Sequence, residues 1–223
     1  MNSSDNILTV GARQSPLSQA QVEEVLQELQ RFCPSIAFKV TWIKTLGDKD
    51  RVTSLRHLEK TDFFTQEIDQ IQLQGKVRIS IHSAKDLPEP LAKGLEMIAL
   101  TKGVNPADSL VFRQGDTLNT LLPNSLVGTS SIRREETIRK LRKDLKCIDI
   151  RGTIQERLEL LYKGSCDALI IAEAALIRLN LTHLPRLFLP GPVAKHQGQL
   201  AVIARQGDEE IKTLFAPLDT RTF

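Results

Sequence analysis

The chain has 223 residues, of which 41% are hydrophobic and 26% are charged, and it carries a formal net charge of +3. This composition is typical of globular proteins and excludes an intrinsically disordered chain. The scattered basic residues do not favour nucleic-acid binding, and no stretch approaches the ~20 apolar residues of a membrane span. Residues 1–6 are polar and do not resemble a secretion signal. We therefore expect a cytoplasmic protein with neither a nucleic-acid nor a membrane partner. A monomer is our expectation for its oligomeric state, which these features do not determine.

The first half of the chain predicts alternating strands and helices. Residues 7–10 form a short apolar strand, and Ser15 and Pro16 then supply an N-cap and a proline at the first position of a helix. Residues 38–42 alternate between apolar and polar side chains, as in a half-buried strand. The stretch 47–63 predicts a loop whose order depends on a ligand. Further predicted elements are a helix at 63–73 and strands at 77–81 and 95–100.

The alternation of strands and helices restarts after residue 103. A capping box formed by Thr153 and Glu156 opens a helix that we expect to end near Gly164. Other predicted elements are strands at 110–112, 126–127, 147–150, 168–171 and 200–204, and helices at 132–145 and after 171.

Two breaks in the pattern, at 103–106 and 190–192, predict that the chain crosses into a second lobe and returns. We expect domains at 1–102 plus 194–223 and at 103–193. The fold class is α/β, with two lobes of mixed, mainly parallel sheets, helices on both faces and a cleft between the lobes. Ligands of such folds meet the carboxyl ends of the strands.

Polar and basic residues gather where several predicted strands end. Helix N-termini at such places offer free N–H groups and a positive dipole end, and guanidinium groups bind carboxylates in a bidentate manner. The pattern favours an anion site, although helix capping alone would also explain the hydroxyl groups. The residues are Arg13, Ser15, Ser83, Lys85, Asp86, Thr129, Ser130, Ser131, Arg133, Arg134 and Arg151.

Asp86 differs from the other residues of this set because it is an acid directly preceded by a base, Lys85. A carboxylate in cationic surroundings has a lowered pKa and stays ionised. It can then stabilise a developing cation or assist a proton transfer. A structural salt bridge or a loop cap is the alternative role for this side chain.

The histidines and cysteines do not show metal-ligand spacing or a C-x-x-C pair, so we expect no metal site and a reducing compartment. We expect the cysteines to be packing residues. The sequence also has no P-loop and no dinucleotide-binding glycine fingerprint. These isolated residues are His57, His82, His183, His196, Cys33, Cys147 and Cys166.

Four stretches that contain the strand-end residues resemble the porphobilinogen deaminase family, also called hydroxymethylbilane synthases. They read GARQSPL at 11–17, HSAKDLP at 82–88, VGTSSIRR at 127–134 and IRGT at 150–153. Arg157, Arg178 and the pair Gln197-Gly198 also fit the family pattern. The stretches follow the family's order and approximate spacing over nearly the whole chain, which makes the set specific.

The resemblance implies a transferase of haem biosynthesis that condenses four porphobilinogen units into a linear tetrapyrrole and releases ammonia at each step. Porphobilinogen and linear pyrrole oligomers are then the partners, and each pyrrole carries an acetate and a propionate. By motif, Asp86 would be the catalytic carboxylate beside the pyrrole nitrogens, and Gln197 and Gly198 would close the cleft near its hinge. The implied substrate- and cofactor-binding residues are Arg13, Ser15, Ser83, Lys85, Thr129, Ser130, Ser131, Arg133, Arg134, Arg151, Arg157, Arg178, Gln197 and Gly198.

The resemblance also implies a dipyrromethane cofactor, held in the family by a thioether to a cysteine in a glycine-rich loop of a third domain. None of the three cysteines lies in such a loop, and the sequence ends at Phe223, about where that domain would begin. We therefore expect that the third domain and the attachment cysteine are absent. The stretch 58–62 (LEKTD) also departs from the glycine-rich, lysine-bearing stretch usual in the family.

Two other functions fit the same residues. One is a non-catalytic binding protein for a carboxylated small molecule, because the predicted two-lobed fold is like that of periplasmic binding proteins. The missing secretion signal argues against a periplasmic carrier. The other is a chain that acts only with a partner that supplies the third domain.

Overall fold

The computed structural model describes residues 7–50, 52–57 and 60–221, and the chain divides into two compact units. Unit 1 comprises residues 1–49, 60–104 and 198–223, and unit 2 comprises residues 50–59 and 105–197. The sequence predicts the crossings at 102/103 and 193/194 and does not assign 50–59 to the second lobe. That each unit is an independent domain stays a prediction.

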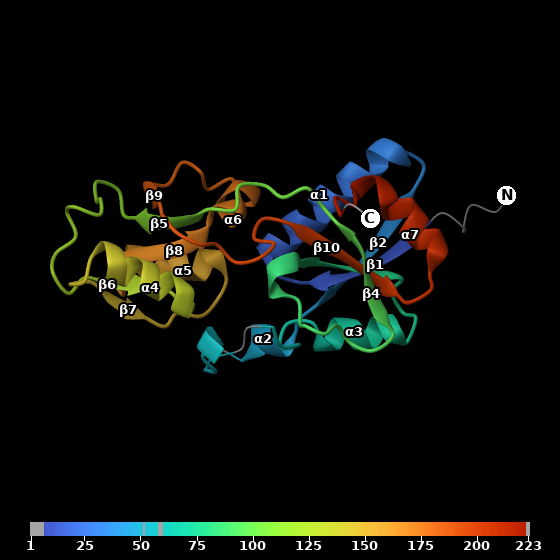
Figure 1. Ribbon diagram of the computed structural model, residues 1–223, viewed down its shortest axis with the longest axis horizontal. Coiled ribbons are helices and arrows are strands. Elements are labelled where there is room, and N and C mark those ends of the chain that lie inside the picture. Colours follow the sequence, from blue (N-terminus) through green and yellow to red (C-terminus); the bar gives the residue numbers. More distant parts are fainter. Residues whose placement is uncertain (1–6, 51, 58–59, 222–223) are drawn as a thin grey trace. The chain divides into compact units, whose positions relative to one another are not determined.

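Unit 1 contains a five-stranded sheet in the order β2-β1-β3-β10-β4 (Figure 1). Its strands are β1 (Ile7–Arg13), β2 (Ala37–Ile43), β3 (Ile79–Ser83), β4 (Leu95–Leu100) and β10 (Leu200–Arg205). Strand β1 runs parallel to β2 and β3, whereas β10 runs antiparallel to β3 and β4. The ends of β1 and β3 and the beginning of β10 therefore lie at one edge of the sheet.

Helices cover both faces of this sheet. Val10 packs in one apolar cluster with Val25 and Phe215, which lie on α1 and α7. The next residue, Gly11, faces α3, where an added Cβ would lie 3.3 Å from Ile68 Cγ2. Glycine at this position thus lets α3 approach the strand. The helical elements are α1 (Pro16–Phe32), α2 (Leu46–Lys49), α3 (Gln66–Leu73), α7 (Glu209–Phe215) and the 3-10 turns η2 (Ala84–Asp86) and η3 (Ala216–Leu218).

Unit 2 contains a second five-stranded sheet in the order β7-β6-β8-β5-β9. Its strands are β5 (Asp108–Phe112), β6 (Leu126–Gly128), β7 (Lys146–Ile148), β8 (Ala168–Ala172) and β9 (Arg186–Phe188). Strand β6 runs parallel to β7 and β8, whereas β5 runs antiparallel to β8 and β9. The ends of β6, β7 and β8 and the beginning of β5 therefore share one edge.

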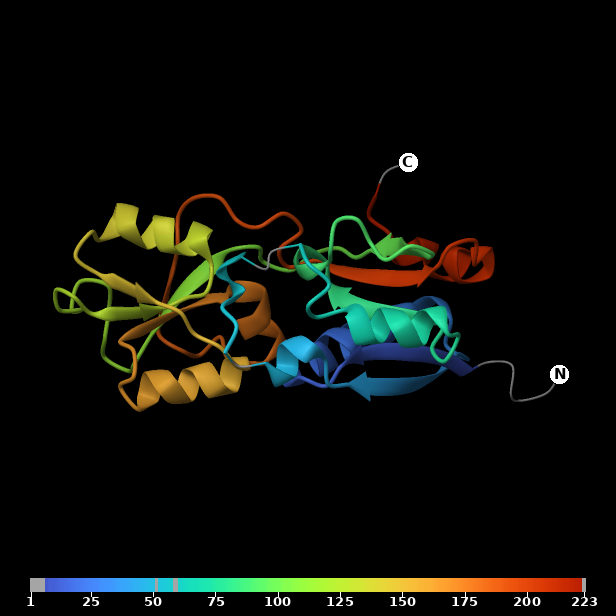
Figure 2. The ribbon, with the colours of Figure 1, turned by 90° about the horizontal axis from the view of Figure 1, so that it is seen from below.

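The helices of unit 2 are α4 (Ile132–Leu141), α5 (Ile154–Tyr162), α6 (Glu173–Arg178) and the 3-10 turn η1 (Leu55–His57). Figure 2 shows α4 and α5 on opposite sides of the sheet. Ile138 of α4 packs with Val127 and Ile170 in the core. The predicted capping box is confirmed, because Thr153 Oγ1 accepts from Glu156 N and Glu156 Oε2 accepts from Thr153 N.

The predicted α/β class with two mixed sheets is confirmed, although each described sheet has as many antiparallel as parallel pairs. The helix expected at 132–145 ends earlier, because Arg142 is extended and its Nη1 donates to the Leu118 carbonyl at 2.7 Å. Strand β9 was not predicted, since it is a three-residue strand with exposed Leu187 and Phe188. Within the described residues, no helix is long and apolar enough to cross a bilayer.

Candidate functional site

The predicted site residues of unit 1 gather at one edge of its sheet. Arg13 ends β1 and Ser83 ends β3, and these parallel strands are neighbours. Gly198 lies at the same edge, because β10 begins opposite Ser83 and Gln199 O accepts from Ala84 N at 3.1 Å. The strand-end pattern read from the sequence thus corresponds to a common location within this unit.

Arg13 is held by an acid that the sequence analysis did not single out, Asp48. Its guanidinium forms an ion pair with the Asp48 carboxylate and lies 4.3 Å from the centroid of the Phe64 ring. Asp48 also accepts from the Thr45 N–H at 3.1 Å and from the Thr45 hydroxyl at 2.9 Å. Burial raises the pKa of Asp48, but the hydrogen bond and charge of Arg13 outweigh it, so that the pKa is lowered. Asp48 therefore stays ionised and fixes the guanidinium.

Ser15 and Ser83 have partners inside unit 1. Ser15 Oγ accepts from Ser18 N at 3.3 Å and caps α1, so capping accounts for this hydroxyl. Ser83 Oγ accepts from Gln21 Nε2 of α1 at 2.7 Å. The Gln21 side chain, which the sequence analysis did not single out, thus fixes the end of β3 against α1.

Asp86 ends the 3-10 turn η2, and its side chain is exposed. The turn is anchored on both sides, because Ala84 and Leu87 are buried in an apolar cluster with Leu95. Lys85 is half-buried beside it. The fold therefore presents the Asp86 carboxylate to solvent from a fixed backbone.

His82 is buried on β3, one residue before Ser83. Burial, and then the nearby charge of Arg13, lower the pKa of His82 to about 4. The imidazole is therefore neutral at physiological pH, in agreement with the packing role expected from the sequence.

The predicted residues of unit 2 also gather at the ends of parallel strands. Thr129 follows β6, and its N–H donates to Ile148 O at the end of β7 at 2.9 Å. Ser130 Oγ donates to the Ile150 carbonyl and accepts from the Ile150 N–H at 3.2 Å. Ser131 precedes α4, and its N–H donates to Thr129 Oγ1 at 3.3 Å. The hydroxyl groups thus fix the loop that leads into α4.

Arg133 and Arg134 share one buried acid, Asp108, which the sequence analysis also missed. Arg133 Nη2 lies 2.7 Å from Asp108 Oδ2, and Arg134 Nη2 lies 2.6 Å from Oδ1. Gln197 Nε2 donates to the same Oδ1 at 2.9 Å. Burial raises the pKa of Asp108, but Arg134 and Arg133 outweigh it, so that the pKa is lowered.

The remaining arginines of the predicted set are half-buried in unit 2. Arg151 Nη2 donates to the Asp50 carbonyl at 2.6 Å, and Arg157 Nε donates to the Gly152 carbonyl at 2.9 Å. Arg178 is the last residue of α6. The structure thus brings Arg151 and Arg157 to the beginning of α5, whereas Arg178 lies at the far end of another helix.

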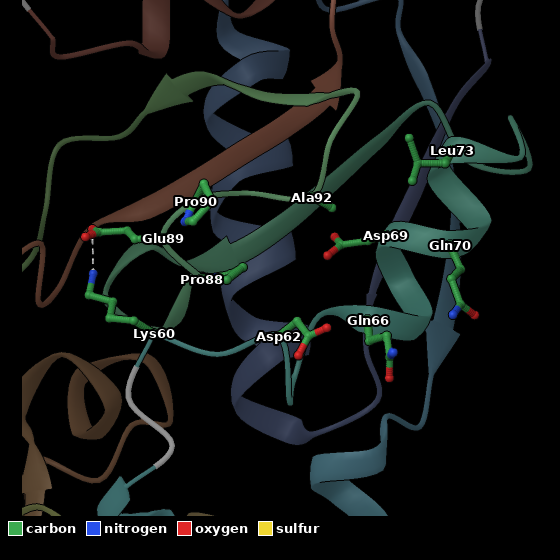
Figure 3. Close-up of a pocket in the computed structure, with 10 residues that line it drawn as sticks. All are labelled: Lys60, Asp62, Gln66, Asp69, Gln70, Leu73, Pro88, Glu89, Pro90 and Ala92. Carbon is green, nitrogen blue, oxygen red and sulfur yellow. Dashed lines mark hydrogen bonds and ion pairs between the residues drawn. The ribbon is translucent and has the colours of Figure 1, made fainter.

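Unit 1 also contains a cavity of about 360 Å³ between α3 and residues 88–92 (Figure 3). Asp69 points into it from α3, and burial raises the pKa of Asp69 to about 6. Lys60 and Glu89 form an ion pair of 2.7 Å at its border. The predicted site residues are not among those that line it, which are Lys60, Asp62, Gln66, Asp69, Gln70, Leu73, Pro88, Glu89, Pro90 and Ala92.

Comparison with known proteins assigns the family. Residues 8–213 match the model of the porphobilinogen deaminase, dipyromethane cofactor binding domain. A probable porphobilinogen deaminase from Chlamydia pneumoniae is 36% identical over 95% of this chain and 89% of the relative. The porphobilinogen deaminase of Roseiflexus castenholzii is 37% identical over 96% of this chain and 72% of the relative. The chain belongs to the porphobilinogen deaminase family.

Solved structures support the same fold. A periplasmic substrate-binding protein of an ABC transporter from Coxiella burnetii aligns with a TM-score of 0.59 at 14% identity, over 95% of this chain and 91% of that one. A putative methionine-binding lipoprotein from Bacillus subtilis aligns with a TM-score of 0.58 at 10% identity, over 97% and 91%. At these identities the likeness shows the fold alone.

The described side chains suit the carboxylate groups of a dipyrromethane better than its thioether attachment. Arginine and serine side chains at the strand ends suit its carboxylate groups. Cys147 and Cys166 do not suit a thioether anchor, which needs a reactive thiolate. Burial raises the pKa of Cys147 and of Cys166 to about 11, and Cys33 lies half-buried at the end of α1. In the described part of the chain, His, Cys, Asp and Glu side chains do not form a group of three that could hold a metal ion.

Proposed function

We propose that this chain is a hydroxymethylbilane synthase-type transferase of haem biosynthesis. It condenses four porphobilinogen units into a linear tetrapyrrole and releases ammonia at each step. Family membership supports the reaction class. The observation that carries the proposal is the position of Asp86, an exposed acid on an anchored turn at the sheet edge that also carries Arg13 and Ser83.

The positive and hydroxyl-bearing groups in this proposal bind the acetate and propionate side chains of the pyrroles. Guanidinium groups suit this task because they stay charged and can donate two parallel hydrogen bonds to one carboxylate. The proposed binding residues are Arg13, Ser15, Ser83, Lys85, Thr129, Ser130, Ser131, Arg133, Arg134, Arg151, Arg157, Arg178, Gln197 and Gly198. It stays a prediction that the binding residues of unit 1 and the binding residues of unit 2 hold the same poly-carboxylate ligand.

Asp86 acts on the charge that develops during the reaction. The protonated aminomethyl group of porphobilinogen leaves as neutral ammonia with the electron pair of its C–N bond, and the positive charge remains on the pyrrole. The Asp86 carboxylate accepts a hydrogen bond from the pyrrole N–H and stabilises this cation. A ring carbon of the acceptor pyrrole then forms the new C–C bond and loses its proton. When bound, a dipyrromethane supplies the first acceptor pyrrole.

The non-catalytic alternative has only the fold likeness to binding proteins in its favour, and that likeness does not identify a ligand. The expected monomeric state, the cytoplasmic location and the absence of nucleic-acid partners stay predictions. So does the expectation that the chain lacks the attachment cysteine, which the raised pKa of Cys147 and of Cys166 supports.

The test is a porphobilinogen assay on the purified chain, combined with its intact mass. We expect consumption of porphobilinogen with release of one ammonia for each unit consumed. The mass shows whether pyrrole units remain bound to the protein. Stabilisation by porphobilinogen without its consumption would instead identify a binding protein.

A further inference from the structure

We propose that Asp108 is a positioning residue, which sets the orientation of Arg133 and Arg134 toward the carboxylates of the substrate and thereby its affinity. This inference rests on the proposed function, since those arginines act on substrate only there. Asp108 itself is buried and acts through the two guanidinium groups.

The location of Asp108 follows from the sheet topology. Asp108 begins β5, which runs antiparallel to β8, so that it lies opposite Ala172 at the end of β8. The ends of β6 and β8 share that edge, and α4 begins three residues after Thr129. A carboxylate at the beginning of an antiparallel strand thus meets the first turn of α4, where Arg133 and Arg134 lie.

The hydrogen bonds around Asp108 fix each arginine through two of its nitrogen atoms. Arg134 donates to Oδ1 through both Nε, at 3.0 Å, and Nη2, at 2.6 Å. Arg133 contacts Oδ2 through Nη2 at 2.7 Å, and its Nη1 donates to the Pro192 carbonyl at 2.6 Å. Guanidinium groups have five N–H donors each, so both arginines retain donors for a further anion.

The charges of the cluster distinguish it from an ordinary structural ion pair. Two guanidinium groups surround one carboxylate at Asp108, which leaves one positive charge in excess. In the same unit, Glu173 is equally buried, but its described ion pairs and hydrogen bonds involve one arginine, Arg186. Arg186 Nη2 donates to Oε1 at 2.8 Å and Nε donates to Oε2 at 2.9 Å. The side chains of Asp108 and Glu173 are 4% and 3% exposed. Of these two acids, Asp108 is thus the one whose cluster combines a fixed geometry with a surplus cation, as an anion site requires.

Gln197 extends the network to the point where the chain leaves unit 2. Its Nε2 donates to Asp108 Oδ1 at 2.9 Å and also to the carbonyls of Pro106 and Ala107. The family motif residue Gln197 therefore has a defined partner in this structure, the carboxylate that holds the arginine pair. Loss of the Asp108 charge therefore weakens an acceptor that both arginines and the Gln197 amide share.

The experiment compares Asp108→Asn with Glu173→Gln, its equally buried control. We expect Asp108→Asn to raise the KM for porphobilinogen about 10-fold while kcat changes less than about 3-fold. Glu173→Gln should leave KM within about 2-fold of the starting protein, whatever its effect on melting temperature. An equal KM in the two variants would overturn the proposal. If Asp108→Asn does not fold, Asp108→Glu takes its place in the comparison of KM with Glu173→Gln. This variant retains the charge but displaces the carboxylate by one methylene, so its KM should also rise.

A double-variant cycle separates positioning from a general loss of stability. In an Arg133→Gln/Arg134→Gln background, Asp108→Asn should not raise KM further, because it acts through those side chains. A full additional increase would contradict the proposal.

Binding of succinate, a simple dicarboxylate probe, provides a readout that is independent of turnover. Calorimetry should show at least about 10-fold weaker binding to Asp108→Asn than to the starting protein or to Glu173→Gln. Equal affinities for the starting protein and Asp108→Asn would overturn the role of Asp108. Failure of porphobilinogen consumption alone would instead count against the proposed function.

Discussion

The Arg56 guanidinium forms an ion pair with the buried carboxylate of Glu135, with Nη2 3.0 Å from Oε2. This contact joins η1 to α4 within unit 2. The sequence predicted a loop at 47–63 whose order depends on a ligand, whereas the described residues 52–57 have a specific partner on the protein itself.

The ion pair of Arg56 predicts that Glu135→Gln loosens residues 52–57. Removal of one partner of a partly buried pair leaves the other charge without compensation. Hydrogen exchange of peptides that cover these residues should become faster, whereas the exposed neighbour Glu136→Gln should leave it unchanged. Equal exchange in both variants would show that this contact does not hold the segment.

His82 predicts a loss of stability in mild acid. Its folded pKa is about 4, below the usual 6.5, so the unfolded chain binds the proton first as the pH falls. Stability should therefore decrease between about pH 6.5 and 4, by on the order of 3 kcal/mol in total. Denaturant unfolding of the starting protein and of His82→Gln at pH 7 and pH 5 measures it. A difference between the two proteins that is the same at both pH values would rule out titration of His82 as the cause.

Asp69 predicts the opposite pH dependence. Burial raises its folded pKa to about 6, so the folded state retains the proton longer than the unfolded chain as the pH rises. The unfolding free energy should therefore be highest below about pH 4, where Asp69 is protonated in both states. It should decrease as the pH rises to about 6. Asp69→Asn, which cannot ionise, should raise the unfolding free energy at pH 7 by ~1–2 kcal/mol. A lower stability of this variant at pH 7 would mean that the ionised carboxylate has a stabilising partner.

A comparison of alanine variants at Gly198 and Gly207 distinguishes the cost of backbone strain from the cost of a steric clash. Both have positive φ angles, of +90° and +81°, but a Cβ on Gly198 would lie 2.5 Å from Val104 O, whereas nothing lies within 4 Å of one on Gly207. Gly207→Ala should cost about 1 kcal/mol from the φ angle alone, and Gly198→Ala at least about 2 kcal/mol more. Chemical denaturation gives both values. Similar losses would mean that the Val104 backbone moves without cost.

The sequence predicts that the candidate site residues lie at strand ends, but it does not reveal the acids that hold the arginines there. Arg13, Ser83, Thr129 and Arg151 follow predicted strands, and the structure confirms that placement within each unit. Asp48 lies 35 residues from Arg13 in the chain, and no local periodicity links two such positions.

Asp108 was missed for a topological reason. In parallel sheets, ligand groups lie after the strands, yet β5 and β10 are antiparallel to their neighbours. Their beginnings therefore lie at the edge where parallel strands end. This brings Asp108 to that edge of the unit 2 sheet and Gly198 to that edge of the unit 1 sheet. The available signal was the polar pair Asp108 and Ser109 directly before the apolar run 110–112.

The most direct test of the account is the turnover of Asp86→Asn. The exposed Asp86 carboxylate is proposed to stabilise the pyrrole cation, so we expect the rate of ammonia release from porphobilinogen to fall at least about 100-fold. The melting temperature should stay unchanged, and Asp62→Asn, another exposed acid of unit 1, should retain its activity. A rate for Asp86→Asn close to that of the starting protein would contradict the central claim.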